Sequence, residues 1–260
     1  MTTSPGGKTE RGAALVTGAA KRLGRAMALA LAEAGFDVAI HYRRSEKEAR
    51  AVADLVAATG RRAATLCADL SKEAETAGLV ARAGAALGPL RLLVNSASVF
   101  EHDDIDTMTR ASWDAHIETN LRAPLKLAQD FAAQAPAGGD NLIVNLIDQR
   151  VLKLTPQFLS YTTAKAALFA LTKTLAQALG PRGIRVNAIG PGPTLRNPRQ
   201  SEADWRRQNE STILGRGASP EDVVGALLYL VDAPAVTGQM IAVDGGQHLV
   251  WRTPDVLAGE

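Results

Sequence analysis

The sequence is poor in cysteine, in aromatic residues and in long apolar runs. Its one cysteine, Cys67, excludes an intramolecular disulfide framework and fits a cytoplasmic location; at the end of a predicted strand it is expected to be inert. No apolar run approaches the roughly 20 residues that cross a bilayer, and the opening MTTSPGGKTER lacks the apolar segment of a signal peptide. With a net charge of only +2 and dispersed basic residues, neither a membrane nor a nucleic acid is an expected partner, and no metal site is predicted.

What the sequence does contain is an alternation of short β-like runs and long, Ala-rich helical stretches. Several apolar runs, such as LLV and LIV, are unbroken, which indicates strands buried on both faces of a parallel sheet. The expected strands are residues 13–17, 37–41, 62–67, 90–95, 141–146, 184–188 and 240–243. The expected helices are residues 23–34, 46–59, 74–87, 110–135, 159–179 and 220–231. This order predicts the α/β class: a single-domain Rossmann fold with a doubly wound, seven-stranded parallel sheet flanked by helices.

One segment, residues 190–208, interrupts the rhythm. It is rich in Pro, Arg and polar residues and follows a strand end, which is the ligand-binding side of an open α/β sheet. A mobile lid is the functional interpretation, and a long surface loop is the alternative. Outside the pattern, residues 1–11 are expected to form a disordered tail and residues 251–260 a C-terminal tail, which leaves one domain over residues 12–250.

The first two predicted strands each end in a segment suited to a nucleotide. The turn TGAAKRLG, from Thr17 to Gly24, leads into a helix whose free N–H groups and positive dipole attract a phosphate. The second strand ends in HYRRS, residues 41–45, and arginines there accommodate a 2′-phosphate, which favours NADPH over NADH. A solvated basic helix start is the alternative, although cations at a helix N-terminus need a compensating anion. Asp69, after the third strand, either accepts from the adenine amine or caps the next helix.

Three side chains suggest proton transfer. Tyr161 and Lys165 are four residues apart at the start of a predicted helix, so the phenol and the ammonium share one face. The ammonium is expected to lower the tyrosine pKa, as a general acid for carbonyl or imine reduction requires. Asp148 follows another strand and is the third candidate, with a turn cap as its alternative role.

Together these motifs resemble the short-chain dehydrogenase/reductase family from Ala13 to about His248. The matching segments are TGAAKRLG, Asp69, NSAS at 95–98, Asn120, the Tyr161/Lys165 pair, Pro191-Gly192 and VDGG at 243–246. Three departures resemble the pteridine reductases within that family. Arg22 stands for the usual middle glycine, Asp148 for the usual serine, and NSAS with Phe100 for the usual NNAG.

The resemblance implies a set of site residues. Catalytic roles are implied for Asp148, Tyr161, Lys165 and Asn120, the last positioning a helix kink and a water of a proton relay. Cofactor contacts are implied for Gly18, Arg22, Leu23, Tyr42, Arg43, Arg44, Ser45, Asp69, Leu70, Asn95, Ala97, Ser98, Tyr161, Lys165, Pro191 and Gly192. Substrate contacts are implied for Arg22, Ser98, Phe100, Asp148 and Tyr161, with Phe100 stacking on a pterin.

The chemistry of the side chains at two of these positions, Arg22 and Asp148, agrees with the resemblance. An arginine in a tight turn is conformationally costly where glycine is usual, and it adds a cation on the buried side. A carboxylate can accept from an amino-heterocycle but cannot donate to a ketone unless it is protonated.

The expected activity is NADPH-dependent reduction of a dihydropterin or dihydrofolate to the tetrahydro form, by a cytoplasmic homotetramer. The alternatives are a carbonyl or alcohol dehydrogenase of the same family and a non-catalytic NADPH-binding regulatory protein.

Overall fold

The fold is a seven-stranded parallel sheet between two layers of helices, as the sequence predicts. The computed structural model describes residues 11–251, so the predicted tails lie outside the described residues except for Arg11 and Trp251. The strands are β1 (Ala13–Val16), β2 (Asp37–Tyr42), β3 (Ala63–Cys67), β4 (Leu90–Asn95), β5 (Asn141–Leu146), β6 (Ile184–Pro191) and β7 (Met240–Val243). Their order is β3-β2-β1-β4-β5-β6-β7, with the direction of winding reversed between β1 and β4. That reversal opens a crevice at the carboxyl ends of the strands.

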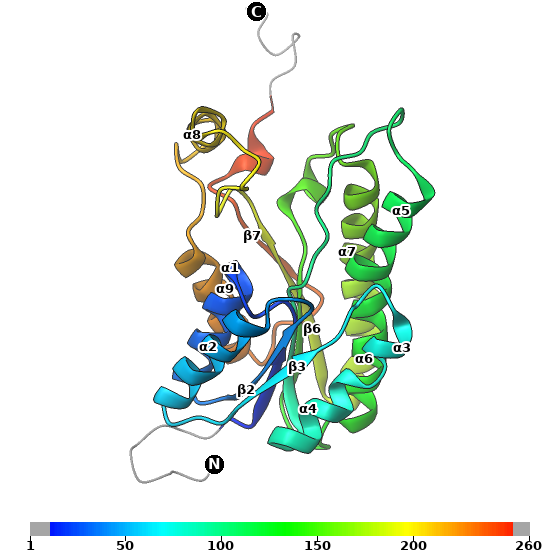
Figure 1. The fold of residues 1–260 in the computed structure, drawn as a ribbon, viewed down its shortest axis with the longest axis vertical. Helices are drawn as coiled ribbons and strands as arrows, with labels where there is room; N and C mark the ends of the chain where they lie inside the picture. Colours follow the sequence, from blue (N-terminus) through cyan, green and yellow to red (C-terminus); the bar gives the residue numbers. More distant parts are fainter. Residues whose placement is uncertain (1–10, 252–260) are drawn as a thin grey trace, which may run out of the picture.

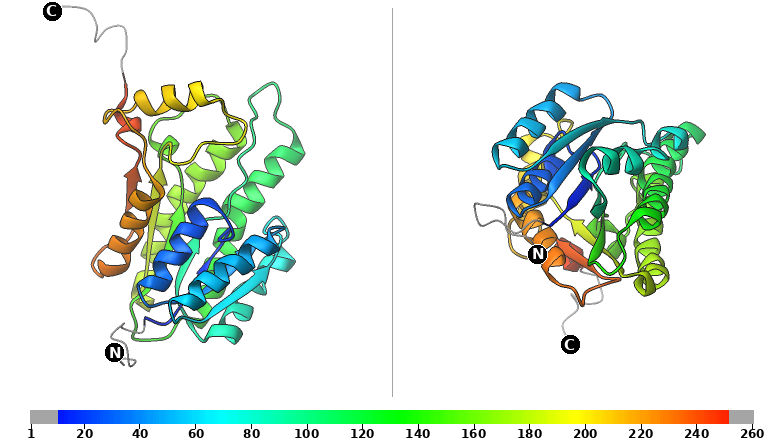
Figure 2. Two further views of the ribbon diagram at one scale, coloured as in Figure 1. Left: turned by 60° about the vertical axis from the view of Figure 1, so that its left-hand side comes forward. Right: turned by 90° about the horizontal axis from the view of Figure 1, so that it is seen from below.

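The helices pack on both faces of the sheet. On one face lie α1 (Arg22–Glu33), α2 (Glu46–Ala58) and α9 (Pro220–Asp232); on the other lie α4 (Leu79–Leu87), α5 (Arg110–Ile117), α6 (Ala123–Gln134) and α7 (Leu159–Leu179) (Figure 1). Seen from below, the sheet is a twisted layer between them (Figure 2). Met27, Leu31 and Ile40 belong to one core cluster, and Phe131 and Leu127 belong to a second. Because both faces are buried, the strands read as unbroken apolar runs.

Two predicted helices are interrupted. The stretch expected as one helix over 110–135 is α5, a π-helical turn over Glu118–Arg122, and α6. The irregular turn contains Asn120, where the sequence predicts a kink. The stretch expected over 74–87 is α3 (Glu73–Thr76) followed by α4, with Ala77 and Gly78 between them. A glycine is a poor helix former, and Gly78 is the N-cap residue of α4.

The predicted lid is only partly a loop. Strand β6 continues to Pro191, and α8 (Glu202–Glu210) forms within the segment. Ser201 caps α8 by accepting from the Asp204 N–H at 3.1 Å, and acidic residues fill its first turn, which favours a helix start. Residues 192–200 form the remaining loop, here called the strap. Helix α8 and the strap lie over the carboxyl end of the sheet (Figure 2). No helix within residues 11–251 has the length and apolarity to span a membrane.

Candidate active site

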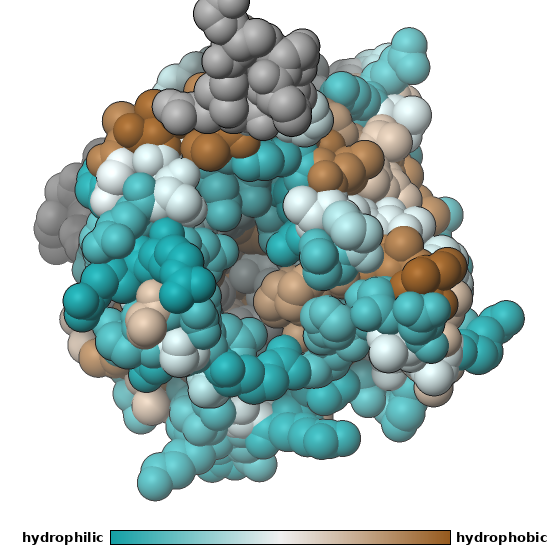
Figure 3. All heavy atoms as spheres, turned by 90° about the horizontal axis from the view of Figure 1, so that it is seen from above, coloured by the Kyte–Doolittle hydropathy of each residue, from teal (hydrophilic) through white to brown (hydrophobic). Residues whose placement is uncertain are grey.

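A cavity of about 880 Å³ opens at the carboxyl ends of the strands. It appears as a hollow, rimmed largely by hydrophilic side chains, when the molecule is seen from above (Figure 3). Its lining includes the predicted site residues Gly18, Arg22, Leu23, Arg43, Asp69, Leu70, Ala97, Ser98, Phe100, Asp148, Tyr161, Lys165, Pro191 and Gly192. Outside that lining lie Tyr42, Arg44, Ser45, Asn95 and Asn120. The structure thus brings most of the predicted site together from segments far apart in the sequence.

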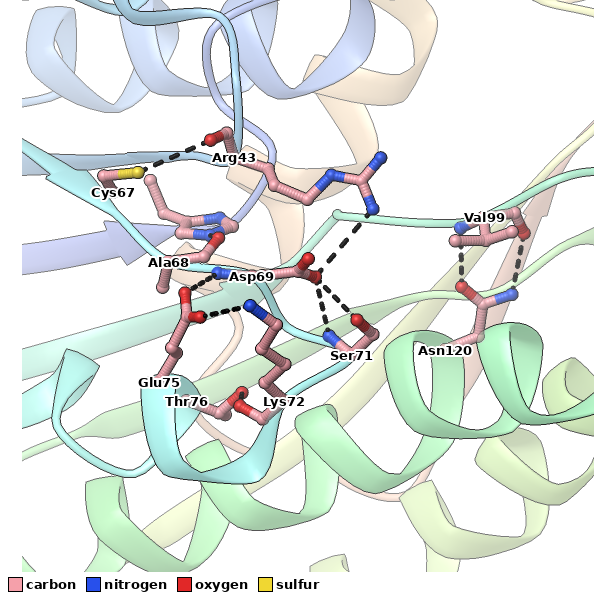
Figure 4. Close-up of polar contacts among 11 residues, drawn as sticks. Arg43, Cys67, Ala68, Asp69, Ser71, Lys72, Glu75, Thr76, Val99 and Asn120 are labelled. Atoms are coloured by element: carbon pink, nitrogen blue, oxygen red, sulfur yellow. Dashed lines mark hydrogen bonds and ion pairs between the residues drawn. The ribbon is translucent and has the colours of Figure 1, made fainter. Parts of the chain in front are cut away.

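Two of the residues outside the lining stabilise the region around the loop that follows β4. Asn120 donates to the Val99 carbonyl and accepts from the Val99 N–H, both at 2.8 Å (Figure 4). Asn95 donates to the Asn145 side chain at 2.9 Å and so links β4 to β5 beneath the site. Thr17 supports the same loop, because its hydroxyl accepts from the Ser96 and Ala97 N–H groups.

The turn between β1 and α1 has a geometry that tolerates few residues. A Cβ on Gly24 would lie 2.3 Å from the Gly18 carbonyl oxygen, so only glycine fits there. Arg22 has φ +54°, a left-handed conformation that favours glycine, as its place in the turn predicts. Its guanidinium, however, is exposed rather than directed to the buried side. It donates to the Leu195 and Arg196 carbonyls at 2.9 and 3.1 Å, because those strap carbonyls face the turn.

His41 braces the same turn, a role that sequence reasoning missed. Its Nδ1 accepts from the Gly18 N–H at 3.0 Å, so Nε2 carries the proton and donates to the Ala68 carbonyl at 3.0 Å. The backbone carbonyl of His41 also accepts from the Ala19 N–H at 2.9 Å. The ring is 2% exposed, and burial lowers the pKa of His41 to about 4. The sequence signal that could have indicated this role is the position of His41 at the start of the HYRRS segment.

The end of the cavity near β2 and β3 is rich in charge. The Arg43 guanidinium lies 3.8 Å from the Asp69 carboxylate (Figure 4). Asp69 also accepts from the backbone N–H and the hydroxyl of Ser71, but it does not cap the next helix, α3, whose N-cap residue is Lys72. Lys21, a lining residue that sequence reasoning did not single out although it lies within TGAAKRLG, pairs with Glu48 at 2.8 Å.

Tyr161 and Asp148 are in direct contact. The tyrosine hydroxyl donates to Asp148 Oδ2 at 2.9 Å, while Asp148 Oδ1 accepts from the Arg150 N–H at 2.8 Å. The aspartate is therefore both the cap of a 3₁₀ turn over Gln149–Leu152 and the partner of the tyrosine. Lys165 donates to the Leu146 carbonyl at 2.8 Å, and its Nζ lies 5.7 Å from the centre of the Tyr161 ring.

The electrostatics of this trio correct one expectation. Burial and the neighbouring Asp148 carboxylate raise the pKa of Tyr161 well above its usual value, rather than lowering it. The reason is geometric: the carboxylate touches the phenol, whereas the ammonium is directed to a backbone carbonyl. Burial also raises the pKa of Asp148 and lowers the pKa of Lys165 to about 8. A buried carboxyl with a raised pKa exchanges its proton more readily near neutral pH.

Aromatic rings form the wall beside Tyr161. The Phe100 ring meets the Tyr161 ring edge-on at 4.7 Å and stacks on the Phe158 ring at 4.5 Å. Ser98 is exposed and lines the same region. Arg199, on the strap, donates to the Phe100 carbonyl at 2.7 Å and pairs with the Glu101 carboxylate. Sequence reasoning missed Phe158 and Arg199, which no local motif marks.

The residues present fit a phosphorylated dinucleotide. The Cβ-excluding contact at Gly24 keeps the backbone close at the start of α1, where phosphates bind to N–H groups. The N-cap residue of α1, Lys21, makes no side-chain capping bond, which leaves first-turn N–H groups for a ligand. Lys21 and Arg43 supply cations at the same end of the cavity.

Comparison with known proteins agrees with this geometry. A family model described as enoyl-(acyl carrier protein) reductase matches residues 18–248. The crystal structure of FolM alternative dihydrofolate reductase 1 from Brucella suis, in complex with NADP, is 47% identical, with a TM-score of 0.90 over 94% of this chain and 98% of that chain. The 3-oxoacyl-[acyl-carrier-protein] reductase of Staphylococcus epidermidis is 31% identical over 91% of this chain and 98% of its own length. An uncharacterized oxidoreductase of Methylorubrum extorquens is 34% identical over 92% of this chain and 98% of its own length. On the extent of these matches, the chain belongs to the short-chain dehydrogenase/reductase family.

Proposed function

We propose that the protein is an NADPH-dependent reductase that converts a dihydropterin, or dihydrofolate, to the tetrahydro form. The observation that carries this proposal is the 2.9 Å hydrogen bond from Tyr161 to Asp148, beside the Phe100 ring. A flat, amino-bearing heterocycle needs an aromatic surface to stack on and a carboxylate to accept its N–H groups. The similarity to the Brucella FolM protein, whose name states a dihydrofolate reductase, supports the same substrate class.

NADPH, when bound, would supply the hydride that reduces a C=N bond. The turn 17–24 and the start of α1 would hold its diphosphate, and Arg43 with Lys21 would hold its 2′-phosphate. Arg44 and Ser45 lie next to Arg43 and remain further candidates for that phosphate. Lys165, nearly buried beside Tyr161, would hold the nicotinamide ribose.

The proton for the reduced nitrogen would come from Tyr161. Its hydroxyl proton already lies in the bond to Asp148, so the carboxyl is placed to return a proton to the phenol after transfer. Burial raises the pKa of Asp148, which makes its protonated form easier to reach than that of an exposed carboxyl. The Lys165 ammonium, 5.7 Å from the centre of the Tyr161 ring, would attract the negative charge that develops on the phenol oxygen from a distance.

A second candidate function is reduction of a ketone, as the name of the Staphylococcus relative states for that protein. Asp148→Ser separates the two functions. It removes the carboxylate that accepts from an amino-heterocycle, and it installs a hydroxyl that can donate to a carbonyl oxygen. Dihydropterin turnover should fall by about 10²-fold or more, whereas ketone turnover should be retained or improved.

The direct test is NADPH oxidation with dihydrobiopterin, dihydromonapterin and dihydrofolate as separate substrates. Turnover of at least one of them, lost in Tyr161→Phe, supports the proposal. Turnover of a ketone in the absence of any reaction with the three pterins would overturn it.

We further propose that the enzyme is a cytoplasmic homotetramer. The support is an edge strand, β7, whose four residues are all half-exposed, and the exposed Tyr229 on the adjacent helix α9. The free thiol of Cys67 is in keeping with a reducing compartment. Light scattering of the purified protein measures the number of chains.

A further inference from the structure

Phe158 stands where the start of a long helix usually has a polar cap. It is the N-cap residue of α7, and no side-chain cap bond comes from it. Ser, Thr, Asp and Asn are preferred at such a position because their oxygens accept from the first N–H groups of the helix. Asp103, from the loop after β4, replaces that cap: its carboxylate accepts from the Ser160 N–H at 3.1 Å, and its carbonyl accepts from the Leu159 N–H at 3.2 Å.

The backbone of Phe158 is also strained. With φ +59° and ψ +50° it is left-handed, and Arg22 is the one other non-glycine residue with positive φ between residues 11 and 251. Bulky side chains are disfavoured in this conformation, and residues held in it cluster at functional sites. A phenylalanine at this position provides no side-chain cap and has a strained left-handed backbone. A favourable interaction of its ring is needed to offset these two costs.

The ring of Phe158 has that interaction with the ring of Phe100, on which the substrate is proposed to stack. It lies 4.5 Å from the Phe100 ring with only 7° between the two planes. The Arg150 guanidinium carbon lies 5.1 Å from the centre of the Phe158 ring, and His102 meets that ring edge-on at 5.0 Å. Phe158 itself does not line the cavity, whereas Phe100 and Arg150 do. The stack therefore supports Phe100 from outside the cavity.

We propose that Phe158 is a positioning residue for the substrate ring. Its left-handed backbone places its ring against one face of Phe100, which fixes the plane of Phe100 beside the Tyr161 ring. This inference rests on the proposed function, because it assigns Phe100 to a stacked heterocycle. It adds that the orientation of the stacking surface is set at the start of α7, three residues before the proton donor.

Three substitutions separate the ring from the backbone. Phe158→Gly removes the ring and relieves the left-handed strain. Phe158→Leu removes the aromatic face and keeps the strain. Phe158→Tyr keeps the aromatic face and the strain. Phe169→Leu is the matched control, since Phe169 is a half-buried phenylalanine of the same helix with the Lys173 ammonium 4.2 Å from its ring centre.

The measurements are KM and kcat for the dihydropterin, KM for NADPH, and melting temperature. We expect the KM for the dihydropterin to rise about three- to tenfold in both Phe158→Gly and Phe158→Leu, the range that loss of one aromatic pair gives. The KM for NADPH should stay within about twofold, and Phe158→Tyr and Phe169→Leu should match the wild type. Phe158→Gly should melt no lower than Phe158→Leu, because glycine accepts φ +59°.

Two results would count against the inference in different ways. An unchanged dihydropterin KM in Phe158→Gly and Phe158→Leu, with an active wild type, overturns the role of Phe158 and leaves the proposed function standing. A wild-type protein that reduces none of the three pterins overturns the proposed function, and this inference with it.

Discussion

His41 shows how one buried side chain can connect the cofactor turn to the rest of the sheet. Both ring nitrogens are engaged, by the Gly18 N–H and the Ala68 carbonyl, and this arrangement exists only in the neutral ring. Protonation would place a second N–H opposite the Gly18 N–H. The stability of the turn should therefore depend on pH.

The first prediction concerns the direction of that dependence. Burial lowers the pKa of His41 from 6.5 to about 4, so below pH 6.5 the unfolded chain binds a proton that the folded chain does not. The contribution of His41 to the free energy of unfolding is therefore fully present above pH 6.5. It falls by about 3 kcal/mol as the pH is lowered to about 4. In His41→Asn, whose amide oxygen can still accept from Gly18, this loss should be absent.

The measurement is the melting temperature of both proteins between pH 7 and pH 4. Arg82 and Asp69 are the charged groups that act on His41, and both remain in the variant, so the difference between the two curves isolates the histidine. Parallel curves across this range would contradict the assignment.

At the scale of elements, helix α1 depends on a glycine for a reason of space rather than of backbone angle. A Cβ at Gly24 would meet the Gly18 carbonyl oxygen at 2.3 Å, and that oxygen belongs to backbone. Gly24→Ala should therefore displace the start of α1 relative to the turn. We expect a loss of about 1–3 kcal/mol in stability, together with weaker NADPH binding.

Gly84→Ala is the matched control for this prediction. Gly84 is inside helix α4, and a Cβ there would meet nothing within 4 Å. This substitution should stabilise the protein by roughly 0.5–1 kcal/mol, because alanine is the better helix former. Melting curves and NADPH titrations of both variants test the pair; equal effects would show that crowding at Gly24 is unimportant.

The sequence predicts elements well where a local pattern determines them. Unbroken apolar runs locate central strands such as β1, β4 and β5, which are buried on both faces, whereas the edge strands β3 and β7 are only partly buried. Helix α8 was harder to foresee: its residues are mostly polar, and none of them is buried. A kink at Asn120 was implied by the family resemblance, but the bonds of its side chain to Val99, far from it in sequence, were not foreseen. No window of the sequence contains that information.

The same distinction applies to the site. Tyr161, Lys165 and Asp148 could be identified because each follows a recognisable element, and the structure brings them together. The raised pKa of Tyr161 could not be anticipated, because it depends on which charge touches the phenol. Phe158 was also not predictable, since its role depends on the Phe100 ring from another strand end.

At the scale of the whole molecule, the cavity joins a charged end near β2 and β3 to an aromatic end near Tyr161. The charged end should determine the choice of cofactor. Lys21 and Arg43 line it, and Arg43 is only loosely paired with Asp69, at 3.8 Å. A 2′-phosphate would complete the neutralisation of Arg43, since Lys21 already pairs with Glu48. NADPH should therefore stabilise the folded protein more than NADH at equal concentration.

The last prediction compares the effects of replacing Arg43 and Arg50 on cofactor binding. Arg43→Gln should weaken NADPH binding by about tenfold or more, because a hydrogen bond to a charged group is lost, and should change NADH binding little. Arg50→Gln is the control: Arg50 is exposed on α2 and pairs with Glu46 at 2.6 Å, away from the cavity lining. Melting temperatures with each cofactor measure the effect. If Arg43→Gln weakens NADPH and NADH binding equally, Arg43 supports the shape of the cavity instead of contacting the phosphate, and the preference for NADPH must come from Lys21 or Arg44.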